Sequence, residues 1–182
     1  MSNEKNNIAK SIFMKYCGSH FHMEREGNYK YYKSFDVSEE QESLWIDECQ
    51  NELLNEIKSE DVVSFNFIKL VGIISQYKRI DGLCALLEFV KMKNGKLDTF
   101  SQIRIAEEIM GVVKAFDANA MNIDVIREAQ KLASDIVNNI DIDNVSIAIY
   151  YKDLGYLTDI LTEENIINRI KNFRRRWDKY TS

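Results

Sequence analysis

The sequence predicts an all-α protein, and three observations lead to this fold class. The 182 residues contain no proline and only seven glycines, so the residue that interrupts helices most strongly is missing. Apolar residues recur at helical spacing over long stretches. Polar residues suited to helix N-caps recur at intervals of roughly 20 residues, which fits one helix and a short connection each.

Seven residues are candidate N-caps, because their side-chain oxygens can accept hydrogen bonds from the first helical turn. They are Ser38, Ser64, Asp81, Ser101, Asn122, Asp143 and Thr162. Two successive helices would make a unit of about 40 residues, the length of a HEAT-like helical hairpin. The spacing therefore predicts antiparallel helical hairpins packed as a short HEAT-like solenoid, with an irregular bundle as the alternative.

Two apolar stripes support the helices in the second half of the chain. Their members follow the i, i+3, i+4, i+7 rule and are expected to face the core. The longer stripe consists of Ile126, Ala129, Leu132, Ala133, Ile136, Val137 and Ile140, and the shorter one of Ile103, Ala106, Met110 and Val113.

The length predicts a single domain over residues 1–182, in which an aromatic segment, 1–37, precedes consecutive helices, 38–182. In the aromatic segment, "HFHM" and "NYKYY" alternate about "EREGN", where Gly27 and Asn28 can adopt positive φ. This alternation predicts a small β-hairpin, and a long ordered loop is the alternative. The hairpin would place Phe21, Met23, Tyr29 and Tyr31 on one face, and His20, His22 and Glu24 on the other.

Both histidines of the chain, His20 and His22, would share one face of that strand. Two imidazoles in this arrangement can bind one transition metal, but a closed site needs two more ligands. The nearby Cys17, Glu24 and Glu26 match no zinc-binding spacing. We therefore expect no metal site, and metal binding by the two histidines is an alternative hypothesis.

No common catalytic motif occurs in the sequence. It lacks HExxH, GxSxG, a P-loop and GxGxxG, so it offers neither a nucleophile elbow nor a phosphate-binding loop. A Cys17–His20 nucleophile pair would have no identifiable oxyanion hole. We expect a protein that is not an enzyme, with no catalytic residue and no cofactor.

Residues 36–61 contain ten acidic side chains and one basic side chain, for a net charge of −9. Apolar residues between them predict an amphipathic acidic helix. Complementary charge speeds encounter with a partner, and aromatic residues anchor contacts. We predict a protein-binding module for a cationic partner, by functional analogy with inhibitors and the immunity proteins that neutralise toxins. The expected binding residues are Tyr29, Tyr31, Tyr32, Glu39, Glu40, Glu42, Trp45, Asp47 and Glu48.

The C-terminal stretch "NRIKNFRRRWDKY" has the opposite charge, +5. Its apolar stripe, Ile166, Ile170, Phe173, Trp177 and Tyr180, predicts a helix that docks by one face and leaves a solvated basic face. The alternative function is nucleic-acid binding, with Arg174, Arg175 and Arg176 on phosphates and Trp177 stacked on a base. The net charge of the whole chain, −5, disfavours nucleic acid as a partner.

The sequence also predicts the cellular compartment of the protein. Its most apolar stretch, "VVSFNFIKLVGIIS", is shorter than the roughly 20 residues that span a bilayer, and the polar N-terminus resembles no secretory signal. Cys17, Cys49 and Cys84 are odd in number and form no CxxC pattern. We expect reduced thiols in a cytoplasmic protein without membrane contact.

Overall fold

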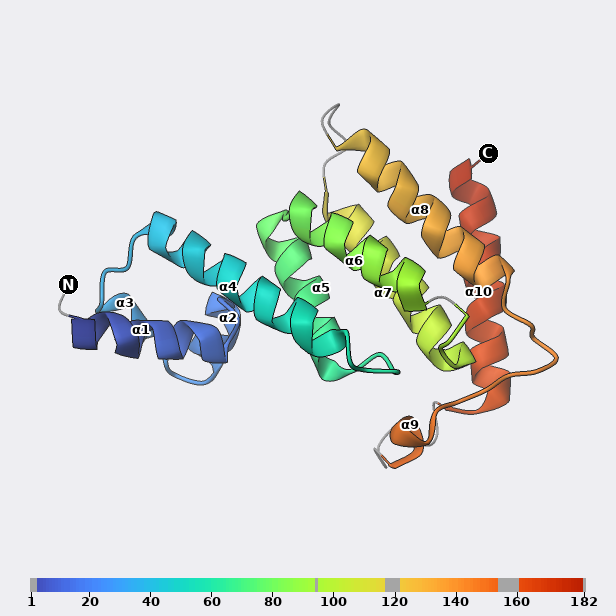
Figure 1. The fold of residues 1–182 in the computed structure, drawn as a ribbon, viewed down its shortest axis with the longest axis horizontal. Helices are drawn as coiled ribbons and strands as arrows, with labels where there is room; N and C mark the ends of the chain where they lie inside the picture. Colours follow the sequence, from blue (N-terminus) through green and yellow to red (C-terminus); the bar gives the residue numbers. More distant parts are fainter. Residues whose placement is uncertain (1–2, 94, 117–121, 154–160, 182) are drawn as a thin grey trace. The chain divides into compact units, whose positions relative to one another are not determined.

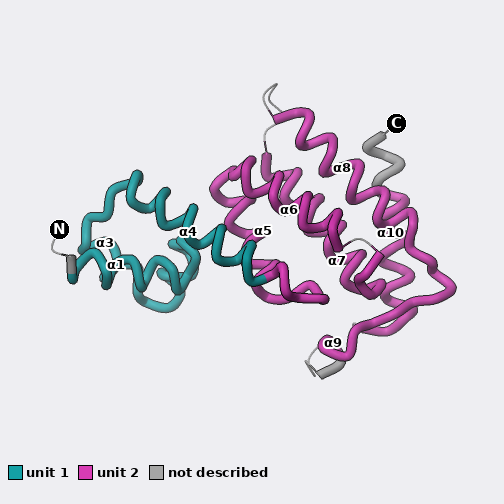
Figure 2. Tube along the Cα trace, in the orientation of Figure 1, with its two compact units in different colours: residues 1–56 teal, residues 57–182 magenta. Residues whose placement is uncertain are grey.

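The computed structural model describes residues 3–93, 95–116, 122–153 and 161–181, without the side chains of residues 3, 152, 153 and 177–181. The described residues form ten α-helices and no strand (Figure 1), which confirms the all-α class. Backbone contacts divide the chain into two compact units, residues 1–56 and residues 57–182 (Figure 2). We call them unit 1 and unit 2. The single domain over residues 1–182 stays a prediction.

Unit 1 is built from α1 (Asn3–Lys15), α2 (His20–Arg25), α3 (Tyr29–Lys33) and α4 (Glu39–Ile57), the last of which ends one residue beyond the unit. Its core forms around Phe13 of α1. The ring of Phe13 lies 5.9 Å from that of Tyr32 and 5.4 Å from that of Trp45, measured between centroids. Aromatic contacts at these distances join α1, α3 and α4.

The predicted β-hairpin is wrong, as is the alternative of a long loop, because residues 20–25 and 29–33 are helical. Ser19 caps α2 by accepting a hydrogen bond from the backbone N–H of His22. Met23 and Tyr32 are buried, whereas Phe21 and Tyr31 are exposed. Burial therefore selects one residue per turn and not every second residue, which is the period of a helix.

The turn between α2 and α3 partly agrees with the sequence. Gly27 has the positive φ that the sequence predicts, +75°, and glycine tolerates this conformation because it has no Cβ. Asn28 instead has a φ of −94°. Its side chain donates hydrogen bonds to the Tyr16 hydroxyl at 2.7 Å and to the carbonyl oxygen of Glu26 at 3.3 Å, which fixes the turn.

Unit 2 contains α5 (Phe65–Tyr77), α6 (Ile80–Lys93), α7 (Thr99–Ala115), α8 (Ile123–Asn138), α9 (Ile149–Asp153) and α10 (Glu163–Thr181). Within it, α7 packs along α8 and α5, and α10 lies against α8 and α7 (Figure 1). The helix α6 contacts both α5 and α8. This packing encloses the apolar core of the unit.

The two apolar stripes of the sequence lie in this core. Every member of the longer stripe, from Ile126 to Ile140, is buried. In the shorter stripe Ile103, Ala106 and Val113 are buried, and Met110 is half-buried. Both stripes are confirmed as core-facing: the longer one lies on α8, except for Ile140, which stands two residues beyond its end, and the shorter one lies on α7.

Four predicted N-caps stand at helix starts. Ser38 accepts a hydrogen bond from the N–H of Gln41, Ser64 from two N–H groups of α5, and Thr162 from the N–H of Asn165. Asn122 occupies the N-cap of α8 without a side-chain hydrogen bond.

Three predicted N-caps are wrong. Asp81 lies inside α6, which begins at Ile80. Ser101 lies inside α7, which begins at Thr99. The cap of this helix is Asp98, whose carboxylate accepts a hydrogen bond from the N–H of Ser101 at 3.2 Å. After Asp143 no helix begins until α9, at Ile149.

None of the helices that the structure describes combines the length and the apolar character needed to cross a bilayer.

Candidate protein-binding surface

The two units differ in charge. Unit 1 contains six basic and eleven acidic residues, for a formal charge of −5, whereas the 18 basic and 18 acidic residues of unit 2 cancel. The net negative charge of the chain therefore resides in unit 1. A charge of one sign on a small unit produces a field that attracts ligands of the opposite sign.

The start of α4 contributes two exposed carboxylates, Glu39 and Glu40. Hydrogen bonds from the backbone N–H of Glu40 itself and from Ser38 hold the pKa of the Glu40 carboxyl below its usual range. Carboxylates in the first turn also interact favourably with the positive end of the helix dipole. Glu40 therefore stays charged to a lower pH than an ordinary glutamate does.

Two of the predicted binding acids make contacts inside unit 1. Glu42 accepts a hydrogen bond of 2.6 Å from the Tyr32 hydroxyl, and its carboxylate lies 3.4 Å from Nε2 of His20. Glu48 forms an ion pair of 2.6 Å with Lys10 of α1. These two acids connect helices of the unit as well as adding to its charge.

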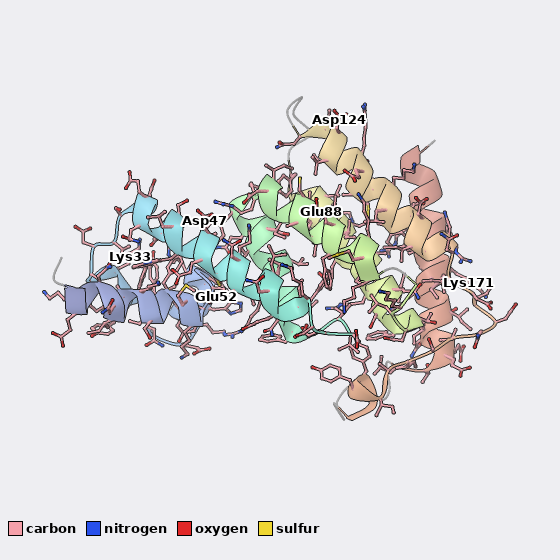
Figure 3. All side chains as sticks on the ribbon, viewed as in Figure 1. Lys33, Asp47, Glu52, Glu88, Asp124 and Lys171 are labelled. Atoms are coloured by element: carbon pink, nitrogen blue, oxygen red, sulfur yellow. The ribbon has the colours of Figure 1, made fainter. Side chains whose placement is uncertain are left out.

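An apolar residue stands in the middle of the acidic side of α4. Leu44 is 61% exposed. Glu40 precedes it by four residues, Asp47 and Glu48 follow at three and four, and Glu52 follows at eight, all on one side of the helix. We call Leu44 and these four acids the acidic face; Figure 3 labels Asp47 and Glu52 on α4. The arrangement resembles a small contact surface, with an apolar centre and a charged rim.

The four predicted aromatic anchors have different environments. Tyr32 and Trp45 are buried in the core of unit 1, so they present little surface to a partner. Tyr29 is half-buried, with its ring 5.2 Å from that of His20. Only Tyr31, among the four, is largely exposed, at 54%.

Tyr31 lines a shallow groove between α1 and α3, with a volume of about 610 Å³. Ile8 and Ile12 of α1 line the same groove, and Ile8 is 38% exposed. Sequence reasoning missed these two isoleucines. Their i, i+4 spacing in a helical N-terminal segment was the signal that could have identified a common face.

His20 and His22 both lie on α2, two residues apart, so their side chains point to different sides of the helix. The His20 ring lies near the rings of Tyr29 and Tyr32, whereas His22 is exposed and contacts the ring of Phe21. Among the described residues, no three His, Cys, Asp or Glu side chains are placed to hold a metal ion together. Metal binding by His20 and His22 stays an untested alternative.

Part of the basic charge of α10 is used inside unit 2. The guanidinium of Arg169 pairs with Glu107 of α7. Arg174 donates hydrogen bonds to the carbonyl oxygens of Val137 at 2.8 Å and Ile140 at 2.9 Å, at the C-terminal end of α8. In the apolar stripe, Ile166 and Ile170 are buried.

The remaining members of the nucleic-acid alternative have different positions. Arg175 and Arg176 are exposed, and Arg175 donates a hydrogen bond of 2.9 Å to Asn172. The side chains of Trp177 and Tyr180 lie outside the described residues. Nucleic-acid binding by α10 stays a prediction.

No family model, curated protein or solved structure matches this chain.

Proposed function

We propose that the protein is a non-enzymatic protein-binding module, of the inhibitor or immunity-protein kind, and that its acidic face engages a cationic partner. The observation that carries this proposal is the exposure of Leu44 among acidic residues on one side of α4. When a partner covers an apolar residue in this place, the removal of its surface from water favours binding. The surrounding carboxylates favour a partner with lysine or arginine around the contact.

The charge distribution supports the same partner class. Unit 1 holds the whole formal net charge of −5, and Glu40 and Glu52 are exposed on it. Long-range attraction by such a unit acts mainly on the association rate and weakens as salt is added.

The experiment uses the full chain as immobilised bait in extract of its native cell, at low and at high salt. The test variant combines Asp47→Lys with Glu52→Lys. The control combines Glu88→Lys with Asp135→Lys, which changes the charge equally at exposed positions of unit 2. A cationic protein captured by the wild type and by the control should associate at least about tenfold more slowly with the test variant at low salt. Equal association with both variants would exclude the acidic face as the contact.

A short HEAT-like solenoid is our proposal for the fold of unit 2, with an irregular bundle as the alternative. Alternate helices pack on each other, α5 on α7 and α6 on α8, as they do when two helical hairpins stack. A cytoplasmic location also stays a proposal, supported by the odd number of cysteines and by the lack of a CxxC pattern among Cys17, Cys49 and Cys84.

A further inference from the structure

We propose that residues 141–151 form a strap that opens as one unit and uncovers the first turn of α7 when it opens. The strap follows the buried residue Ile140 and ends at Tyr151, in the short helix α9 (Figure 1). None of residues 141–150 is buried. Segments that bury little apolar surface belong to the parts of a protein that open at the lowest cost in free energy. The strap is therefore held closed by a few contacts near its C-terminal end.

Ser146 makes the first of these contacts. Its hydroxyl accepts a hydrogen bond of 3.1 Å from the backbone N–H of Thr99, and its own backbone N–H donates one of 2.9 Å to the Thr99 hydroxyl. The carbonyl oxygen of Ser146 also accepts a hydrogen bond of 3.3 Å from the N–H of Phe100. We call these bonds the Ser146 contact. They satisfy two N–H groups at the start of α7, which have no partner within the helix.

Tyr151 makes the second contact. Its hydroxyl accepts a hydrogen bond of 2.7 Å from the backbone N–H of Val63 and lies 2.9 Å from the hydroxyl of Ser101. Its ring packs edge-to-face against the ring of Phe100, with centroids 4.7 Å apart. We call these interactions the Tyr151 contact. Because Tyr151, Phe100 and Ser101 are buried, loss of this contact exposes both apolar surface and paired polar groups.

The two contacts share one residue of α7. Phe100 takes part in the Ser146 contact through its N–H and in the Tyr151 contact through its ring. The strap residues of the two contacts are also near neighbours in the chain, so loss of one contact releases the segment that positions the other. We therefore expect both contacts to be lost in the same opening, as contiguous segments often are. The open state presents the N–H groups of Thr99 and Phe100, which the closed strap occupies.

Native-state hydrogen exchange tests the strap, with NMR on the full chain and urea added below the unfolding transition. Four amides donate a bond that opening breaks, those of Val63, Thr99, Phe100 and Ser146. They should share one opening free energy, lower than that of the amide of Ala133 in the middle of α8. This free energy should decrease only slightly as urea is added, because opening exposes little surface.

Tyr151→Phe tests the coupling between the contacts, since it removes no bond made by the amides of the Ser146 contact. If the strap opens as one unit, exchange of those three amides should nevertheless become faster by about tenfold. The matched control is Tyr150→Phe, which removes a hydroxyl from a ring that is 44% exposed. This control should leave the exchange rates of all four amides unchanged.

Ser146→Ala provides the reciprocal check, because it removes the acceptor of the Thr99 N–H and should speed exchange at Val63. It also decides the question if Tyr151→Phe does not fold. The proposal is overturned if the four amides open at different free energies or if they open only together with Ala133. It is also overturned if either variant accelerates exchange only at the amides of its own contact.

Discussion

The Tyr151 hydroxyl accepts a hydrogen bond of 2.7 Å from the backbone N–H of Val63 and donates one of 3.1 Å to the carbonyl oxygen of the same residue. It also lies 2.9 Å from the hydroxyl of Ser101, which itself donates to Asp98 at 2.6 Å. One buried hydroxyl thus joins the segment before α5, the first turn of α7 and the short helix α9.

Tyr151→Phe should destabilise unit 2 by about 1–3 kcal/mol, because it leaves buried polar groups of Val63 without this partner. The free energy of unfolding in urea, followed by circular dichroism, measures the effect. Tyr150→Phe is the matched control, since Tyr150 is 44% exposed, and it should change stability by less than about 0.5 kcal/mol. Equal effects of the two variants would show that the hydroxyl of Tyr151 does not hold these segments together.

The same hydroxyl predicts a loss of stability at high pH. Burial raises the pKa of Tyr151 to about 12, whereas a tyrosine in an unfolded chain has a pKa of about 10. Between these values the unfolded chain binds fewer protons than the folded chain, so the free energy of unfolding falls as the pH rises. The stability that wild type has over Tyr151→Phe should therefore be smaller at about pH 11 than at about pH 9. A difference that stays constant over this range would contradict the raised pKa.

Arg174 is expected to matter for stability more than its basic neighbours do. Its guanidinium donates hydrogen bonds to the carbonyl oxygens of Val137, in the last turn of α8, and of Ile140, two residues beyond the helix. Arg174→Ala should cost about 1–3 kcal/mol in urea unfolding, against less than about 0.5 kcal/mol for Arg176→Ala, which changes an exposed residue. Similar costs would mean that these hydrogen bonds contribute little.

Because Arg174 has a structural role, the nucleic-acid alternative should be tested on its exposed neighbours instead. Arg175→Ala combined with Arg176→Ala removes exposed charge while leaving the contacts of Arg174 in place. If α10 binds nucleic acid, filter retention of RNA or DNA by the wild type should decrease as salt is added, and the double variant should reduce it. Absence of salt-dependent retention by the wild type would reject the alternative.

Local patterns predicted much of unit 2 and less of unit 1. The stripe from Ile126 to Ile140 could be predicted because a helix of this length repeats its buried side several times. The helices α2 and α3 have only six and five residues, too few for the helical period to differ clearly from alternation. Each of these helices buries one side chain completely, Met23 in α2 and Tyr32 in α3. That burial depends on packing within the unit and not on the local pattern.

The candidate surface was predicted in its charge but not in its anchors. The acids of α4 are evident from composition, since charge needs no knowledge of contacts. Tyr32 and Trp45 were expected at the surface and are buried, because each ring packs against Phe13 of another helix. The short helix α9 depends in the same way on the Tyr151–Val63 hydrogen bonds, between residues 88 positions apart.

For three glycines, backbone conformation alone should decide whether substitution by alanine raises or lowers the free energy of unfolding. For Gly72 of α5, Gly111 of α7 and Gly27, no described atom apart from the adjoining backbone lies within 4 Å of the position a Cβ would take, and of these three only Gly27, at +75°, has a positive φ. Alanine loses less conformational freedom than glycine when it enters a helix, so Gly72→Ala and Gly111→Ala should each raise the free energy of unfolding by about 0.5–1 kcal/mol. At Gly27 an added Cβ meets its own backbone, and Gly27→Ala should lower it by about 1–2 kcal/mol. Urea unfolding of the three variants provides the test. Destabilisation by Gly72→Ala or Gly111→Ala would show that these open helix surfaces are covered by something that an added methyl group displaces.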